Sequence, residues 1–176
     1  MTEPAFPIRR AEPADAASLA DFAARIFAET FGPDNRPEDM ASHLADRFGA
    51  RQQTEEILDP AVVTLLVEAD GRLIAYTQVT TLHPPPPCVT GEAPVEIGRF
   101  YVDRAWQGKG LAQGLMVAAK DAARELGGRT VWLAVWEHNP RAIAFYEKCG
   151  FRDVGSQPFR LGADLQTDRV MVAPLG

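Results

Sequence analysis

Two glycines stand directly in front of a helical pattern in the segment QGKGLA, residues 107–112. Gly108 and Gly110 allow the backbone to come close to a bound group, and the first N–H groups of a helix have no partner within the helix. Together with the helix dipole, these N–H groups favour phosphate oxygens. The segment therefore predicts a loop that binds a phosphorylated ligand.

Three kinds of phosphate-binding loop compete for this segment. A dinucleotide fold needs the spacing G-x-G-x-x-G and an acid about 20 residues on, at a strand end. Here Gly114 comes one residue late, and Glu125 falls within the predicted helix. A nucleoside triphosphate loop needs a Gly-Lys-Ser/Thr end, which the chain lacks. The third kind, a pyrophosphate loop reading Gln or Arg, two residues, Gly, one residue, then Gly or Ala, is met from Gln107 to Ala112.

Cysteine and histidine give no comparable pattern. Cys88 and Cys149 are the only cysteines, and their separation excludes a CxxC zinc cluster or a disulfide framework. His43, His83 and His138 have no metal-ligand spacing. Neither cysteine has a basic sequence neighbour that would favour a covalent thiol intermediate. We therefore expect no metal and no covalent enzyme intermediate.

Length and composition indicate one ordinary globular domain over residues 1–176. The chain is 46% hydrophobic and 24% charged, with a net charge of −6. An acidic protein favours cationic partners such as amines and argues against nucleic acid. The N-terminus lacks a signal-peptide pattern, and no apolar run is long enough for a membrane span. We expect a soluble, cytoplasmic protein that binds no membrane.

Hydrophobic periodicity predicts a mixed α/β order of elements without internal repeats. Helices are predicted at residues 13–31, 37–48, 52–58, 111–126 and 140–149. Strands are predicted at residues 6–9, 62–69, 73–80, 95–102, 130–136, 151–162 and 168–175. Asp70-Gly71 predicts a hairpin turn, and Gly98 inside a strand indicates a bulge. The four prolines at residues 84–87 predict a stiff surface loop between strands.

The glycine loop and its neighbours together resemble the GNAT superfamily of N-acetyltransferases. The loop follows the strand triplet FYV and Asp103, and Asn139 precedes AIAFYEKCGF, residues 142–151. The resemblance covers about residues 94–152 and implies a mixed, mostly antiparallel sheet of about seven strands flanked by about four helices. It also implies acetyl-CoA as cosubstrate. The segments FAETFGPDNRPEDM, VWEHNPRAIAFY and QTDRVMV resemble, more narrowly, bacterial PaiA-type polyamine N-acetyltransferases over nearly the whole chain.

The resemblance implies where acetyl-CoA binds. The family holds the pyrophosphate on loop N–H groups, pairs the pantetheine arm with the preceding strand and contacts the cofactor through an Asn side chain. Asn139 can equally serve as a helix N-cap. The residues implied are Phe100, Tyr101, Val102, Gly108, Lys109, Gly110, Leu111, Ala112, Gln113 and Asn139.

The resemblance also implies catalytic roles. Tyr146 matches the family's general acid, although a tyrosine on an apolar helix face is commonly a core residue. Glu96 is the candidate base, or else a solvated residue near a strand end, and Glu137 is the reserve. A backbone N–H near Phe100 or Tyr101, freed by the bulge, could stabilise negative charge on the carbonyl oxygen.

A polycationic acceptor needs carboxylates around its site. Glu29 and Asp34, with Glu38 and Asp39, occupy the region where the family builds its acceptor wall, and each is also compatible with a solvated helix end. Trp136 and Trp106 could offer aromatic faces to ammonium groups.

The resemblance to PaiA-type enzymes implies a polyamine such as spermidine or spermine as the acceptor. The alternatives are another amine (an amino acid, an antibiotic or a protein N-terminus) and a non-catalytic acyl-CoA sensor. Some N-terminal-amine acetyltransferases of the family carry a Glu where this chain has Ala134. A proton donor at Tyr146 favours a catalyst over a sensor. The resemblance also implies that the protein is a monomer or a homodimer.

Overall fold

The computed structural model describes residues 6–176, which form one seven-stranded sheet with helices on both faces. The strands are β1 (Ile8–Arg10), β2 (Val62–Ala69), β3 (Arg72–Thr80), β4 (Pro94–Val102), β5 (Thr130–Trp136), β6 (Arg152–Leu161) and β7 (Asp164–Pro174). The helices are α1 (Ala16–Phe31), α2 (Pro37–Arg47), α3 (Ala50–Leu58), α4 (Leu111–Glu125) and α5 (Pro140–Lys148). Three short 3-10 helices, η1 (Pro13–Asp15), η2 (Gly32–Asp34) and η3 (Arg104–Trp106), link them.

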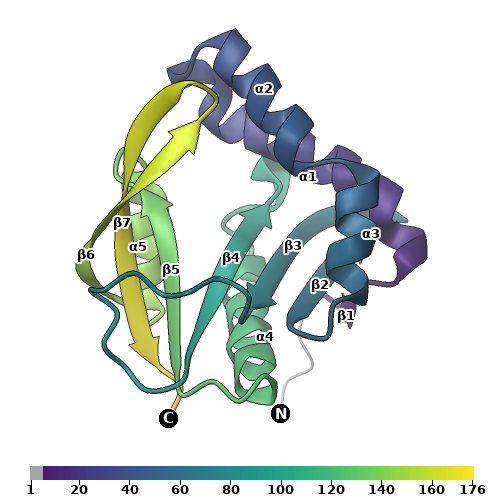
Figure 1. Cartoon of the computed structure of the whole chain (residues 1–176). Helices are drawn as coiled ribbons and strands as arrows, with labels where there is room; N and C mark the ends of the chain where they lie inside the picture. The colour runs from purple at the N-terminus through teal and green to yellow at the C-terminus, as the bar shows by residue number, and fades with distance from the viewer. Residues whose placement is uncertain (1–5) are drawn as a thin grey trace.

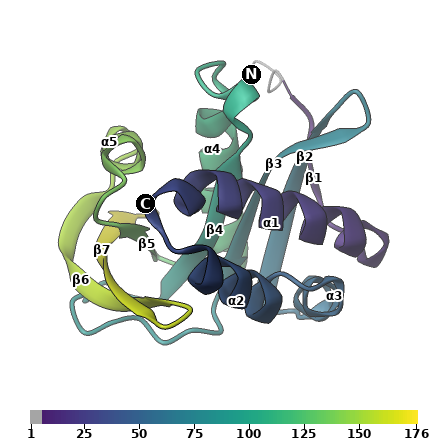
Figure 2. The same cartoon turned by 90° about the horizontal axis from the view of Figure 1, so that it is seen from above.

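The sheet order is β1-β2-β3-β4-β5-β7-β6, and only β4 and β5 pair in parallel. Helices α1, α2 and α3 cover one face, and α4 and α5 cover the other (Figures 1 and 2). This confirms the predicted mixed, mostly antiparallel sheet, and the five α-helices within residues 6–176 match the five predicted from periodicity, one more than the approximate number that the resemblance implied.

Each face of the sheet carries its own core. On α4, residues such as Leu115, Ala119 and Ala122 recur at helical spacing and are buried against the sheet. Strand β2 is buried on both faces, with Leu65 in the α4 core and Leu66 in the α1 core. A strand buried on both sides needs a continuous apolar run, which explains the sequence VVTLLV.

The β2–β3 hairpin turns at Asp70 and Gly71, as predicted. Their φ angles are 51° and 72°, so both residues adopt the left-handed conformation of a type I′ turn. Asp and Gly tolerate this conformation better than other residues do.

Strand β4 contains the predicted bulge at Gly98. Arg99 lies opposite Gln78, but Ile97 lies opposite Val79, so Gly98 is an extra residue. Before the bulge, Ile97 faces the α4 core, and after it Phe100 faces the same side. Tyr101, five residues after Glu96, therefore shares the opposite face with Glu96, against ordinary alternation.

Strands β4 and β5 pair over only three residues. Their register runs from Pro94 opposite Thr130 to Glu96 opposite Trp132, after which the two strands separate. The remaining part of each strand leaves one backbone edge unpaired toward the other. This separation opens the middle of the sheet.

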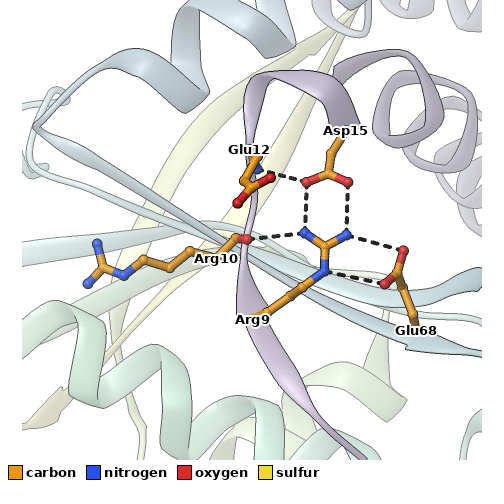
Figure 3. Close-up of polar contacts among 5 residues, drawn as sticks. All are labelled: Arg9, Arg10, Glu12, Asp15 and Glu68. Carbon is orange, nitrogen blue, oxygen red and sulfur yellow. Dashed lines mark hydrogen bonds and ion pairs between the residues drawn. The ribbon is translucent and has the colours of Figure 1, made fainter.

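Arg9 fixes the corner where β1 leads into α1 (Figure 3). Its guanidinium donates two hydrogen bonds of 2.8 Å to Asp15 and further bonds to Glu68 on β2. Asp15 also accepts from the Glu12 backbone N–H at 2.7 Å. The side-chain hydrogen bonds with Arg9 lower the pKa of Asp15 below its ordinary value.

Residues 81–93, with prolines at 84–87, form a loop without helix or strand, as predicted. The loop crosses in front of the sheet between β3 and β4 (Figure 1). Val89 packs in a small core with Trp132 on β5 and Val170 on β7. The loop thus covers part of the face that α1 and α2 leave open.

Element boundaries differ from the sequence predictions mainly at the ends of the chain. Strand β1 begins at Ile8, and β7 begins at Asp164, earlier than the predicted residue 168. The extra length of β7 lets it pair with β6 up to a turn at Gly162, where φ is 59°. In the described part of the chain, no helix combines the length and apolar character needed to cross a membrane.

Candidate active site

A cleft of about 1030 Å³ opens where β4 and β5 separate. One part, called here the α4–α5 half, is lined by Gln107, Gly108, Gly110, Ala112, Gln113, Asn139, Phe145 and Tyr146. The other, called the α1–α2 half, is lined by residues including Phe27, Glu29, Phe31, Asp34, His43, Glu96, Tyr101, Trp136, Gln157 and Asp168. The site residues expected from sequence therefore gather, with few exceptions, around one cavity.

The glycine loop lies at the start of α4 in the α4–α5 half. Gly108 and Gly110 have φ angles of 75° and 79°, a conformation that other residues rarely adopt. Nothing lies within 4 Å of a Cβ built at either glycine, and no side chain caps the helix. Within residues 6–176, no side chain caps the first N–H groups of α4, which leaves them available to an anion such as a pyrophosphate.

Two residues of the loop point away from the cleft. Leu111 is 3% exposed and belongs to the α4 core, while the Lys109 ammonium lies 4.7 Å from the centre of the Trp106 ring. Only the backbone of these two residues is positioned to act in the loop. Trp106 packs on Phe6 and Lys109 outside the cleft, so it offers no aromatic face to an acceptor.

Besides Arg47 and Arg99 in the α1–α2 half, three cations that the sequence analysis did not single out line the cleft. Arg104 follows β4, and Arg141 and Lys148 lie on α5. Arg141 occupies the first turn of α5, where the helix dipole disfavours a positive charge. That unfavourable placement is the sequence signal that could have indicated an anion-binding role.

The unpaired edge of β4 presents backbone N–H groups to the gap. Asp103 donates its N–H to Ile74 on β3 at 2.8 Å. Because N–H directions alternate along a strand, those of Phe100 and Val102 point to the opposite edge, toward β5. Gln107 Nε2 also donates to the Val102 carbonyl at 3.2 Å, which ties the glycine loop to this edge.

Asn139, at the start of α5, and Tyr146, within α5, both line the cleft between β4 and β5. The Asn139 Oδ1 accepts from the Ala142 N–H at 3.3 Å and so caps α5, while the residue also lines the cleft. Tyr146 is 8% exposed and packs edge-on against Phe100. Within residues 6–176, no hydrogen bond engages its hydroxyl, and burial raises its pKa well above the ordinary value. Tyr146 therefore keeps its proton at neutral pH.

Glu96 lies where β4 and β5 part, with its side chain 13% exposed. His83, the last residue before the prolines, donates from Nδ1 to Glu96 Oε2 at 2.5 Å. Both residues line the cleft. The proline loop therefore contributes a titratable side chain to the site.

The expected acidic wall is only partly assembled. Glu29 and Asp34 line the α1–α2 half, and Glu29 is also paired with Arg25 at 3.0 Å. Asp39 instead accepts from the Ala163 N–H at 2.9 Å, so it fixes the β6–β7 turn. Glu38 and Glu137 are outside the cleft lining, and Glu137 lies 3.5 Å from His138.

Asp168 is a cleft residue that the sequence analysis missed. It lies on β7 opposite Trp136 of β5 and Gln157 of β6. Asp168, Val170 and Val172 alternate along β7 and so share one buried face of the strand. An acid in this apolar alternation is the sequence signal that could have found it. Burial raises the pKa of Asp168 to about 6, and the Glu137 carboxylate adds to the shift.

Comparison with known proteins agrees with this geometry. The model of the acetyltransferase (GNAT) family matches residues 21–151, so the chain belongs to that family. An uncharacterized N-acetyltransferase of Mycobacterium tuberculosis is 34% identical over 162 residues, which is 92% of this chain and 98% of the relative. The predicted GNAT fold is confirmed, and the protein is an acetyl-CoA-dependent N-acetyltransferase.

Two further similarities are to an aminoglycoside acetyltransferase and to a solved N-acetyltransferase structure. An aminoglycoside N(6')-acetyltransferase type 1 of Stenotrophomonas maltophilia is 28% identical over 149 residues, 83% of this chain and 86% of the relative. The crystal structure of a PaiA N-acetyltransferase from Thermoplasma acidophilum, in complex with coenzyme A, superposes with a TM-score of 0.77. Its identity is 18% over 97% of this chain and 99% of that one, a likeness of fold.

Proposed function

We propose that the protein transfers the acetyl group of acetyl-CoA to a primary amine of a small polycationic substrate, such as spermidine or spermine. The observation that carries this proposal is the excess of carboxylates in the α1–α2 half of the cleft. The acids that line it are Glu29, Asp34, Glu56, Glu96 and Asp168, and the arginines are Arg47 and Arg99. Arg99 is already paired with Glu56 at 2.8 Å, so the remaining charge favours cations.

The α4–α5 half is the proposed cofactor site. The N–H groups from Gly108 to Gln113 hold the pyrophosphate, and Arg104 and Arg141 add positive charge around it. The N–H group of Val102 pairs with the pantetheine arm as a neighbouring strand would. The Asn139 side chain contacts the arm while its Oδ1 caps α5. When bound, acetyl-CoA supplies an acetyl group on a thioester.

Three actions of the chain then account for direct transfer. The acceptor must lose a proton, because its ammonium has an ordinary pKa near 10.4. Glu96, supported by His83, takes this proton directly or through a water. The Phe100 N–H stabilises charge on the carbonyl oxygen, worth about 3 kcal/mol. Tyr146 gives its proton to the leaving sulfur as the new C–N bond forms and the C–S bond breaks.

Aminoglycosides are the second candidate acceptors. They are polycations with primary amines, and the relative from Stenotrophomonas maltophilia carries that activity in its name. The resemblance to PaiA-type polyamine acetyltransferases favours the smaller, linear polycations. Both classes would use the same carboxylates.

An amine panel tests the proposal. Purified protein is mixed with acetyl-CoA and spermidine, spermine, an aminoglycoside, an amino acid or a peptide N-terminus, and free thiol is followed. We expect turnover to be highest with spermidine or spermine. Turnover only on the amino acid or the peptide contradicts the polycation proposal, and tight acetyl-CoA binding without thiol release from any amine indicates a sensor.

A further inference from the structure

Asp168 is a largely buried carboxylate in the wall of the cleft, and it has no partner among residues 6–176. It is 7% exposed, yet within residues 6–176 no hydrogen bond or ion pair engages its side chain. By contrast, the acids whose pKa is lowered, such as Asp15, Asp39 and Asp153, gain that shift from hydrogen bonds with arginine or backbone groups. An isolated buried carboxylate is costly, so its retention in a cavity wall indicates an external partner.

Asp168 lies in the part of the cleft where the acceptor is proposed to bind. It shares a sheet face with Trp136 and Val170, the face covered by α1 and α2 rather than by the glycine loop. Asp168 lines the cleft there, and Phe31 of α1 stacks edge-on with Trp136 at 5.8 Å. A carboxylate beside aromatic faces forms a site that suits an ammonium group.

We propose that Asp168 binds an ammonium group of the acceptor substrate. This rests on the proposed transfer to a cationic amine and names the residue that selects for it. The ammonium donates hydrogen bonds to the carboxylate. The substrate thus becomes the hydrogen-bond partner that Asp168 lacks within residues 6–176. Hydrogen bonds to charged groups contribute enough to change affinity by about tenfold or more.

The surrounding ionisable groups leave this role to Asp168. Glu137, beyond the end of β5, raises the pKa of Asp168, and the phenol of Tyr101 on β4 has its own pKa raised to about 12. From α2, His43 lines the same half, and burial lowers its pKa, which keeps it neutral. On β6, the opposing residue is the uncharged Gln157. The carboxylate therefore meets no cation until a substrate arrives.

The test compares Asp168→Asn and Asp168→Glu with wild type. With spermidine as the probe, we expect Asp168→Asn to raise KM at least tenfold, while the acetyl-CoA dissociation constant stays unchanged. Asp168→Glu keeps the charge and should restore most of the affinity. Asp121→Asn, an exposed acid on α4, is the matched control and should behave as wild type.

Two further readouts separate binding from a structural role. Calorimetric titration of spermidine into the protein with coenzyme A should lose most of its signal in Asp168→Asn. The KM ratio between variant and wild type should shrink as the pH falls through about 6, where Asp168 itself becomes neutral. An unchanged KM with spermidine and an equal titration signal would overturn the proposal.

The amine panel keeps this proposal distinct from the broader one. If wild type prefers an aminoglycoside, the same variants are tested on that amine, and a raised KM still supports Asp168. If the n-butylamine KM rises as much as the spermidine KM, Asp168 holds the reacting ammonium. A rise for spermidine alone assigns it to a second ammonium.

Discussion

His83 and Glu96 form a hydrogen bond of 2.5 Å between the start of the proline loop and the strand that carries the proposed chemistry. The two residues are 13 positions apart and come from segments with unrelated sequence patterns. Because Glu96 is largely buried, this bond fixes its orientation toward the cleft. If Glu96 is the base proposed above, the proline loop positions a catalytic residue as well as covering the sheet.

Glu96→Gln should lower kcat/KM for spermidine by about 100-fold, because an amide cannot accept the proton of the acceptor. His83→Ala should have a smaller effect, about fivefold, since it removes only the hydrogen bond that orients Glu96. Thiol release at saturating acetyl-CoA measures both. Leu82→Ala, an exposed neighbour in the same loop, serves as control. Full activity of Glu96→Gln would assign the proton to another group.

Tyr146→Phe should lower kcat by about 100-fold with little change in acetyl-CoA affinity. The ring keeps its contacts with Phe100 and Phe151, so stability should hold. Stopped-flow thiol release and calorimetric titration of acetyl-CoA separate the two effects. Unaltered turnover would remove Tyr146 from the mechanism.

Gly110→Ala should raise the dissociation constant for acetyl-CoA about tenfold. Its φ of 79° costs an alanine about 1–2 kcal/mol, which distorts the loop N–H groups. Gly114→Ala is the matched control, because Gly114 lies inside α4 with open space around it. That control should bind normally and gain about 0.5–1 kcal/mol in stability. Equal affinity of both variants would argue against the loop as the phosphate site.

Asp15→Asn should destabilise the protein at pH 7 by about 1 kcal/mol, a modest figure because Arg9 is partly exposed to solvent. The folded-state pKa of Asp15 lies below its ordinary 3.8, so its stabilisation is present above that pH. It is lost as the pH falls through the lowered pKa. Urea unfolding of variant and wild type should therefore converge in acid, and a pH-independent difference would contradict the ion pair in Figure 3.

Asp168→Asn should have the opposite effect on stability: it should stabilise the protein at high pH, where Asp15→Asn destabilises it. The folded-state pKa of Asp168 is raised from 3.8 to about 6, so the stability it contributes below pH 3.8 is lost as the pH rises through about 6. At pH 8 the variant should be more stable than wild type by about 2 kcal/mol, and below pH 4 the two should agree. Thermal unfolding across this range checks the prediction. A destabilised variant at pH 8 would mean that the carboxylate has a partner.

The strands, the α4 loop and the bulge at Gly98 could be predicted because each depends on local pattern. Alternation, glycine conformation and helix caps act within a few residues. The acceptor side could not be predicted in the same way, because its walls come from α1, α2, β4 and β7 together. Asp34 and Asp39 occur in similar sequence surroundings. Asp39 has a structural role only because it binds the turn at Gly162, which is distant in the sequence.

Trp106 and Asp168 show that position in the sequence alone does not decide which residues line the cleft. Trp106 is next to the glycine loop in sequence, yet it packs on Phe6 outside the cleft. Asp168 lies in the segment QTDRVMV, where the sequence analysis named no site residue, yet the pairing of β7 with β5 brings it into the cavity. Strand order, which places the last strand beside β5, was the missing information.

The extra residue in β4 sets which side chains share a face of the sheet. If the strand kept Gly98 but were regular, Tyr101 and Glu96 would project from opposite sides of the sheet, and Phe100 would exchange places with Tyr101. Deleting Gly98 would remove the bulge together with the extra residue, so Glu96 and Tyr101 would stay on one face. Relatives with β4 strands of different length at this point could therefore present the same side chains to the cleft.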